Sequence, residues 1–331
     1  MVAISVIIPV YNVEKQLERC LHTVVNQLFD DYEVICINDG STDSSPEILK
    51  KYAAKYKQIK VINQENKGLC TARNVGMDAV TGEYVLFADS DDYFTGFNTF
   101  NVLYNFAKKN NSDALIFDFM EGNDLGEISR ISTIPLIYRL AGYSAFNAQT
   151  ASAEIYRYIP IGVWSKLYKA EFIKDKRFEI VSYLEEGPFW DKVYTGAERI
   201  NYLPVPFYFY VKNREGSITT NFGKKIFDIF KSFDYSIDIV KKAGYYEKLK
   251  DIIYVHMCSN LCFNAKRMNP EYREKYISAI KNYNMDIDYS ACNTEKFFPF
   301  EVDDVLVIRF IKEHDFADVE KLFKDHNLWQ D

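Results

Sequence analysis

The sequence predicts a protein of the α/β class, with a mostly parallel sheet between flanking helices and a helical C-terminal region. The first observation is the alternation of short apolar runs with amphipathic segments over residues 4–89. Because apolar runs are typical of buried strands and a three- or four-residue apolar spacing is typical of helices, their alternation predicts parallel strands joined by helices. The second observation is a helical periodicity over residues 222–268 and 271–283. We therefore expect an α/β domain over residues 1–218 and a mainly helical extension over residues 219–331.

Each expected element follows from its own local pattern. Strands are expected over residues 4–10, 33–37, 59–62 and 84–88, where apolar residues run together. Helices are expected over residues 13–28, after Ser44 or Ser45, and over residues 69–80. Asn12 suits the N-cap of the first helix, and Pro46 suits the first turn of the second. Further along, the pattern predicts a helix over residues 98–109, a strand over 114–119 and an extended segment over 202–211, while residues 305–311 fit a helix or a strand.

Three acidic residues, Asp89, Asp91 and Asp92, follow the fourth strand directly. An ionised carboxylate is costly to bury without a partner, so these side chains need water, a cation or a polar ligand. A strand-like backbone would point Asp89 and Asp91 to the same side. Two such oxygen ligands suit Mg²⁺ or Mn²⁺, which also bind the oxygens of a diphosphate. A polar loop that caps the strand would explain the same Asp-x-Asp motif.

The expected sheet also predicts where a ligand would bind. In open parallel sheets, ligands bind beyond the carboxyl ends of the strands. This rule brings residues 9–12, 38–41 and 89–91 to one edge. Neither G-x-G-x-x-G after the first strand nor G-x-x-x-x-G-K-[ST] is present, which disfavours dinucleotide binding and P-loop hydrolysis.

Composition narrows the class of protein further. The chain has 331 residues, of which 48% are hydrophobic, and a net charge of −7 that argues against a nucleic-acid-binding surface. No apolar run approaches the roughly 20 residues of a membrane span. The N-terminus lacks the basic segment of a signal peptide, and the six cysteines form no C-x-x-C motif. These features predict a reduced, cytoplasmic protein.

Four strings carry a resemblance to a known family. They are SVIIPVYN (5–12), NDGSTDSS (38–45), NKGLCTARNVG (66–76) and GEYVLFADSDDY (82–93). In this order and spacing they resemble the family 2 glycosyltransferases, whose Rossmann-like fold is called GT-A. The match is strong over residues 4–94 and weaker over about 155–218. The resemblance implies transfer of a sugar from a nucleotide-sugar, usually with a divalent cation and with inversion at the anomeric carbon.

The resemblance also implies which residues bind the nucleoside. Tyr11 would stack on uracil, and Asp39 would accept a hydrogen bond from a ring N–H. Arg73 and Lys67 would meet the base, the ribose or a phosphate, and Arg73 suits this better because its planar guanidinium both stacks and donates in pairs. Each of Tyr11, Asp39 and Lys67 also has a plain structural explanation at the end of a strand or in a solvated loop. The other residues expected around the nucleotide are Pro9, Asn12, Gly68 and Ser90.

The same resemblance gives roles near the diphosphate. Asp89 would face the ribose, and Asp91, with Asp89 beside it, would bind Mn²⁺ or Mg²⁺. That cation would neutralise the departing diphosphate as a Lewis acid. Residues 212–214 occupy the place where relatives carry a basic residue toward the diphosphate, which makes Arg214 a further candidate, although a solvated loop would explain them as well.

The expected general base lies in a second acidic turn. Relatives carry a Glu-Asp pair there, whereas this chain has Glu185-Glu186, and Glu keeps the chemistry of Asp on an arm one methylene longer. Glu186 is the expected base, with Asp191 and Glu185 as alternatives, and a solvated acidic turn would explain the pair too. Trp164 and Trp190 suit either a platform for the acceptor or the core.

Taken together, the resemblance implies an inverting hexosyltransferase. It would move a hexose or N-acetylhexosamine from a UDP-sugar to a lipid-linked or protein-linked glycan. A nucleotidyltransferase is one alternative, although residues 11–14 lack its glycine-rich phosphate loop, and a catalytically impaired binding subunit is another. Residues 222–250 combine lysines with aromatic residues, which suits either peripheral membrane contact or a helical lid.

Overall fold

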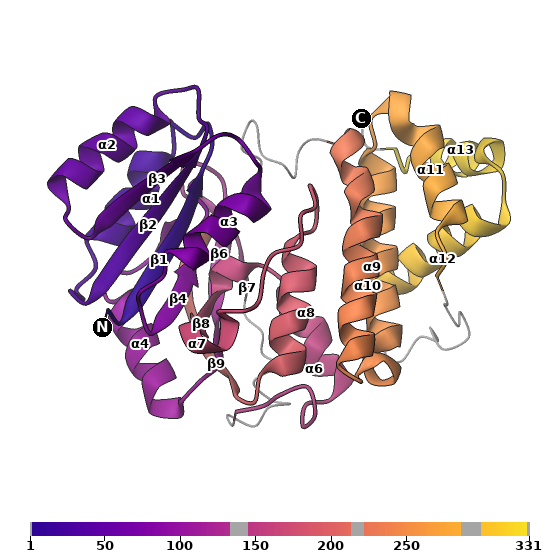
Figure 1. The fold of residues 1–331 in the computed structure, drawn as a ribbon. Helices are drawn as coiled ribbons and strands as arrows, with labels where there is room; N and C mark the ends of the chain where they lie inside the picture. Colours follow the sequence, from indigo (N-terminus) through magenta and orange to yellow (C-terminus); the bar gives the residue numbers. More distant parts are fainter. Residues whose placement is uncertain (1, 133–144, 213–221, 286–298, 330–331) are drawn as a thin grey trace. The chain divides into compact units, whose positions relative to one another are not determined.

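The computed structural model describes residues 2–132, 145–212, 222–285 and 299–329 (Figure 1). The chain divides into two compact units. The first unit comprises Met1–Ile180 and Glu185–Arg214, and the second comprises Val181–Leu184 and Glu215–Asp331.

The first unit begins with the alternation that the sequence predicts. Its elements are β1 (Ile4–Val10), α1 (Leu17–Val25), β2 (Tyr32–Asp39), α2 (Ser45–Lys55), β3 (Ile59–Gln64), α3 (Leu69–Asp78) and β4 (Tyr84–Phe87). These four strands are parallel neighbours in the order β3-β2-β1-β4. The α/β class is therefore confirmed, and β1 and β2 are buried along their whole length, as expected of strands covered on both faces.

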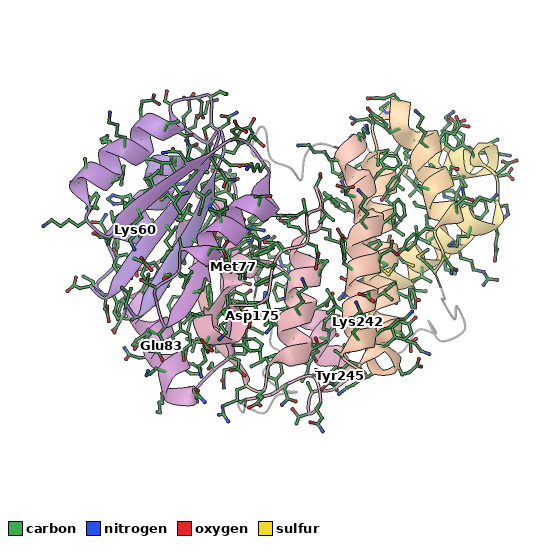
Figure 2. All side chains as sticks on the ribbon, viewed as in Figure 1. Lys60, Met77, Glu83, Asp175, Lys242 and Tyr245 are labelled. Atoms are coloured by element: carbon green, nitrogen blue, oxygen red, sulfur yellow. The ribbon has the colours of Figure 1, made fainter. Side chains whose placement is uncertain are left out.

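Helices cover both faces of this sheet because successive strand residues point to opposite sides. Ile8 belongs to one apolar cluster with Leu21 of α1. On the other face, a Cβ added to Gly76 of α3 would lie 2.5 Å from Ile7 and 2.8 Å from Ile37. Only a residue without a side chain lets α3 approach the sheet this closely. Side chains fill the space between the sheet and its helices (Figure 2).

The second half of the first unit continues the same sheet with mixed strand directions. Its elements are β5 (Tyr93–Phe94), α4 (Thr99–Asn110), β6 (Ala114–Gly122), β7 (Ile128–Ser132), α6 (Ala153–Tyr158), β8 (Lys166–Lys169), α7 (Ala170–Ile173), α8 (Glu186–Gly196) and β9 (Ile200–Val211). The strand order continues from β4 as β8-β6-β9-β5, and β7 pairs with β6. Strand β8 is antiparallel to both β4 and β6, whereas β9 is parallel to β6. This arrangement brings β8 and β9 near the end of β4, where the acidic residues follow.

The second unit is helical, as expected. It contains α9 (Ile229–Lys242), α10 (Tyr246–Arg267), α11 (Arg273–Asn282), α12 (Pro299–Glu313) and α13 (Phe316–Asp325). Residues 305–311, which fitted a helix or a strand, belong to α12. Helix α10 is its central element and contacts α9, α11 and α12. Among the residues that the structure describes, no helix has both the length and the apolar character needed to cross a membrane.

Two local expectations are wrong. Asn12 is not an N-cap, because α1 begins only at Leu17; Asn12 has a φ of 50°, and its Oδ1 accepts a hydrogen bond of 2.8 Å from the backbone N–H of Thr42. The strand also does not continue through the acidic residues, because β4 ends at Phe87. The backbone N–H of Asp92 donates to the carbonyl oxygen of Asp89 at 3.1 Å, so the acids lie in a turn and strand alternation does not orient them.

Candidate active site

The carboxyl ends of β1, β2 and β4 form one edge because these strands are parallel neighbours. Tyr11 follows β1 directly and is 48% exposed, which leaves its ring accessible to a ligand. Asp39 ends β2 and is buried. The expected edge of polar residues is therefore present, with an exposed ring beside a buried carboxylate.

Three donors fix the carboxylate of Asp39. Its Oδ1 accepts from Nε2 of Gln64 at 2.6 Å and from the backbone N–H of Lys67 at 2.9 Å, and its Oδ2 accepts from the backbone N–H of Gly68 at 2.9 Å. Gln64 is in place because it pairs with Asp39 across β2 and β3. Gly68 has a φ of 85°, a conformation that favours glycine. Since a carboxylate oxygen can accept two hydrogen bonds, Oδ2 can take a further donor.

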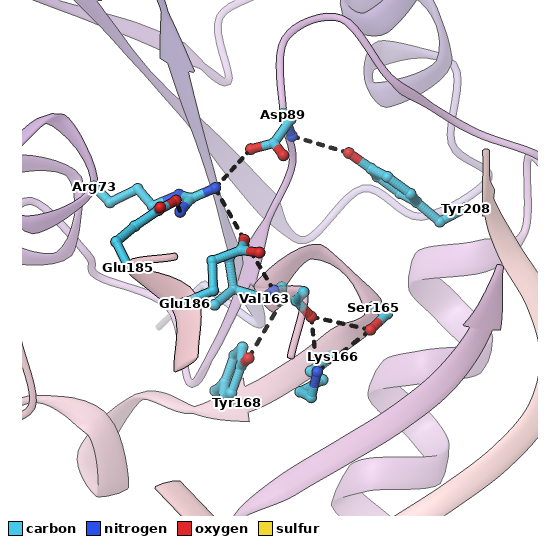
Figure 3. A network of polar contacts seen from close by, with 10 residues as sticks. Arg73, Asp89, Val163, Ser165, Lys166, Tyr168, Glu185, Glu186 and Tyr208 are labelled. Carbon is cyan, nitrogen blue, oxygen red and sulfur yellow. Dashed lines mark hydrogen bonds and ion pairs between the residues drawn. The ribbon is translucent and has the colours of Figure 1, made fainter. Parts of the chain in front are cut away.

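Arg73 of α3 is the centre of a charged network (Figure 3). Its side chain is only 1% exposed, and its Nη2 lies 2.9 Å from Oδ1 of Asp89. Its Nη1 lies 2.8 Å from Oε1 of Glu185, and its Nη2 also lies 3.1 Å from Oε1 of Glu186. One guanidinium therefore joins the acidic turn after β4 to the start of α8.

The start of α8 presents Glu185 and Glu186 to this network. Leu184 precedes them with a φ of 59°, an uncommon conformation for a residue with a branched side chain. Negative charge is also favourable at this end of a helix, where unpaired N–H groups point outward. Oε1 of Glu186 accepts from the backbone N–H of Val163 at 3.2 Å.

The pKa of Glu186 suits a general base. Burial raises its pKa to about 7; the charge of Arg73 opposes this rise, while Glu185 and Asp89 add to it. A carboxylate with a pKa near neutrality can take up and release a proton at physiological pH. Among the three candidate bases, Glu186 combines a charged partner, Arg73, with a raised pKa.

Asp191 lies on the same helix but has other surroundings. It is buried, and the hydroxyl of Tyr156 donates to its Oδ1 at 2.5 Å. The structure thus brings Glu185 and Glu186 together with Arg73, whereas Asp191 packs against α6.

Two further acids follow Asp89 in the acidic turn. Asp91 is half-buried, and its carbonyl oxygen accepts from Arg19 at 3.0 Å. Asp92 is buried, and its Oδ1 accepts from the backbone N–H of Val211 at 2.8 Å. Burial, followed by the charges of Asp91 and Asp89, holds the pKa of Asp92 well above its ordinary value.

This donor set fits a divalent cation that also binds a substrate. In the described ranges, no group of three or more His, Cys, Asp or Glu side chains could hold a metal ion alone. Asp89 and Asp91 instead offer two carboxylates in one turn. A cation held by two carboxylates needs further oxygen ligands, which a diphosphate supplies.

The remaining candidate residues have mixed surroundings. Pro9 and Ser90 are buried, and the side chain of Lys67 is exposed. Nζ of Lys212 lies 2.5 Å from Oε2 of Glu121, so its charge is already paired. Arg214 and its neighbour at position 213 lie outside the described residues.

Both tryptophans are buried: Trp164 is 7% exposed and Trp190 is 1% exposed. Trp190 is a fully buried core residue, which argues against a role as an acceptor platform. The ring of Trp164 is stacked on Tyr208 of β9, with 4.9 Å between the ring centres.

Sequence reasoning missed two residues of the network in Figure 3. The hydroxyl of Tyr208 accepts from the backbone N–H of Asp89 at 2.9 Å. Lys166 of β8 is completely buried, next to the residues that contact Glu186. A charged residue inside the apolar run of residues 163–168 was the available signal for Lys166, whereas nothing local distinguishes Tyr208 from the other aromatic residues of β9.

Comparison with known proteins places this site in a family. The family model described as "Glycosyl transferase family 2" matches residues 5–158. The uncharacterized glycosyltransferase EpsJ of Bacillus subtilis is 30% identical over 298 residues, which cover 85% of this chain and 84% of EpsJ. This chain belongs to glycosyl transferase family 2.

Other relatives show how far the likeness reaches. The glycosyltransferase GlyA of Streptococcus pneumoniae is 32% identical over 246 residues, which cover 73% of this family 2 chain. The match spans only 35% of GlyA itself.

The solved structure of S. aureus TarS (residues 1–349) in complex with UDP-GlcNAc superposes with a TM-score of 0.72 at 21% identity. The superposition covers 99% of the family 2 chain and 92% of that TarS chain. This likeness confirms the GT-A fold with a helical C-terminal region.

Proposed function

We propose that this chain transfers a hexose or N-acetylhexosamine from a UDP-sugar to a hydroxyl group of a glycan acceptor, with inversion at the anomeric carbon. The observation that carries this proposal is the Arg73 network, in which one guanidinium contacts both Asp89 and Glu186. Asp89 follows β4 at the expected nucleotide edge, and Glu186 is the candidate base. Family membership and the UDP-GlcNAc complex of TarS, a structural neighbour, support the choice of donor.

Tyr11 and Asp39 would recognise the uracil. The exposed ring of Tyr11 offers a stacking surface, and Oδ2 of Asp39 can accept the ring N–H. Because the carboxylate is already fixed by Gln64, Lys67 and Gly68, it loses little freedom when the base binds.

Glu186 would act as the general base. Its carboxylate takes the proton of the acceptor hydroxyl while that oxygen forms a bond to the anomeric carbon. The bond from that carbon to the diphosphate oxygen breaks at the same time, and UDP leaves with the bonding electrons. Because the hydroxyl attacks the face opposite the diphosphate, the configuration inverts.

Asp91 and Asp89 would hold a divalent cation, Mn²⁺ or Mg²⁺. The cation would neutralise the negative charge that develops on the departing diphosphate. The presence of both carboxylates in the turn of residues 89–92 supports this assignment.

Peripheral membrane contact through residues 222–250 stays a prediction, as does a cytoplasmic location. Ile229, Phe233 and Val240 of α9 are buried. Lys231 and Lys242 are exposed and pair with acids of the same segment. Because this apolar face of α9 is buried, contact with a membrane would depend on the exposed lysines exchanging these acids for anionic lipid. Flotation with anionic liposomes at low and high salt would measure this contact, and a protein that stays unbound at low salt contradicts it.

A panel of nucleotide-sugars tests the proposed function. The protein is mixed with Mn²⁺ and each UDP- or GDP-sugar, and both the melting temperature and the release of free nucleotide are measured. A UDP-sugar should raise the melting temperature and be slowly hydrolysed. A binding subunit would be stabilised without releasing UDP, and stronger stabilisation by GDP-sugars would contradict the proposed donor.

A further inference from the structure

Lys166 is a buried lysine whose partners are unusual. Its side chain is 0% exposed in the middle of the sheet, on β8. Nζ donates to the carbonyl oxygens of Pro160 at 2.5 Å and Gly162 at 2.7 Å, and lies 4.6 Å from the ring centre of Trp190. In the described part of the chain, no carboxylate forms an ion pair with it. A buried ammonium without a carboxylate is costly, so the contacts it makes are expected to have a use.

These contacts fix a short turn, residues 160–165. Lys166 holds two of its carbonyl groups, and the hydroxyl of Ser165 donates to the same Gly162 oxygen at 3.0 Å. The hydroxyl of Tyr168 reaches the carbonyl oxygen of Val163 at 3.4 Å. The peptide groups on both sides of Val163 therefore have fixed orientations.

Val163 connects the fixed turn to Glu186. Its backbone N–H donates to Oε1 of Glu186, the oxygen that Arg73 also contacts (Figure 3). In the part of the chain that the structure describes, both contacts are made to Oε1. Oε2 is consequently the oxygen that can receive a proton from an acceptor.

We propose that Lys166 is a positioning residue for Glu186: it holds the turn of residues 160–165 so that the N–H of Val163 orients the carboxylate. This inference rests on the proposed role of Glu186 as the base. Lys166 does not touch the reacting atoms, and its effect passes through the backbone of the turn.

The electrostatics of the pair agree with this geometry. Burial lowers the pKa of Lys166 to about 7, and the charge of Glu186 acts in the opposite direction. Glu186 is faced by Arg73 from α3, by Asp89 from the acidic turn, by Glu185 before α8, and by Lys166 and Tyr168 from β8.

A double-mutant cycle tests the proposal. Lys166→Met keeps most of the length of the side chain but removes its charge and donors. Since a small misplacement of a catalytic group can lower a rate about 10²-fold, kcat for transfer should fall by about that factor. KM for the UDP-sugar and the affinity for UDP should stay within about twofold, because the nucleotide edge is untouched.

The second arm of the cycle uses Glu186→Gln. In that background Lys166→Met should change kcat by less than about twofold, because two residues that act as a unit are not additive. Lys169→Met is the matched control: it lies on the same strand, its Nζ contacts Asn111 at 2.9 Å, and its kcat should match the wild type. If Lys166→Met does not fold, Lys166→Gln keeps an N–H donor and gives the same comparison.

The outcomes separate the two claims. Equal factors for Lys166→Met in both backgrounds, or a loss confined to KM, would overturn the positioning role. Full activity of Glu186→Gln alone would instead contradict the proposed base, whatever Lys166→Met does.

Discussion

Arg73 and Asp89 form an ion pair of 2.9 Å in which the guanidinium is almost completely buried. Because the same guanidinium also contacts Glu185 and Glu186, its removal would leave three neighbouring carboxylates without a shared cation. Arg73→Met should therefore lower the free energy of unfolding by about 3–5 kcal/mol, the usual loss when a buried pair is broken. Denaturant unfolding at neutral pH measures it.

A conservative variant provides the control for this prediction. Arg73→Lys should lie between Arg73→Met and wild type in its free energy of unfolding, because a single ammonium cannot bridge several acids as a planar guanidinium does. Identical unfolding curves for Arg73→Met and wild type would show that the network adds nothing to stability.

Asp39 is expected to read uracil through its ring N–H. Asp39→Ala should raise the dissociation constant for UDP about tenfold, which corresponds to about 1.4 kcal/mol. Gln64→Ala, which removes one support of that carboxylate, should cause a smaller rise. Calorimetric titration with UDP and GDP measures both variants, and tighter binding of GDP by the wild type would refute the assignment.

Asp91 is expected to bind the divalent cation. Asp91→Asn should abolish transfer and weaken UDP binding in Mn²⁺, because an amide is a poorer ligand than a carboxylate for a hard cation. Asp78→Asn is a suitable control, since Asp78 pairs with Arg177 at the surface. If wild-type affinity for UDP is the same with Mn²⁺ and with EDTA, the metal role is wrong.

Activity should depend on pH through Glu186. A base must be ionised, and the pKa of Glu186 is about 7, so kcat should rise as pH increases through about 7. The rate of UDP release between about pH 5 and 9 measures this dependence. An acidic limb near the ordinary carboxyl pKa of 4.5 would mean that the base is a solvated carboxylate.

Stability should move in the opposite direction over the same range. The folded pKa of Glu186 lies above its ordinary value of 4.5, so between these values the folded protein holds a proton that the unfolded chain has lost. The stabilisation that comes from protonated Glu186 is therefore lost as pH rises from about 4.5 to 7. Glu186→Gln should flatten this part of the stability profile, and an unchanged slope would count against the shifted pKa.

Much of the fold follows from local sequence pattern. The predicted limits of the first strand, residues 4–10, are those of β1, because an uninterrupted β-branched run is typical of a strand covered on both faces. Residues 305–311 could not be assigned, because a short apolar run fits a buried helix as well as a strand.

Asn12 shows the limit of a local rule. Asn suits an N-cap, but here its side chain bonds to Thr42, thirty positions away, and the chain needs a residue that tolerates a positive φ. The long-range hydrogen bond to Thr42, and not the local N-cap preference, therefore determines the conformation of Asn12.

The candidate site depends on contacts between residues that lie even further apart in the sequence. Arg73 and Glu185 are 112 positions apart, so no spacing rule could pair them. Lys166 acts through the carbonyl groups of a turn. Because every residue has a backbone carbonyl group, the sequence does not reveal which of them a lysine contacts.

Comparison of kcat for Glu186→Gln and Asp191→Asn tests the central claim most directly. Glu186→Gln keeps the shape of the side chain but cannot take a proton, so transfer should slow about 10²–10⁴-fold while affinity for the UDP-sugar stays nearly unchanged. Asp191→Asn should keep most of its activity, because the hydroxyl of Tyr156 donates to Oδ1 of Asp191 and the amide oxygen of Asn can accept the same hydrogen bond. The contrary result, an inactive Asp191→Asn beside a Glu186→Gln variant with more than half of wild-type kcat, would contradict the account.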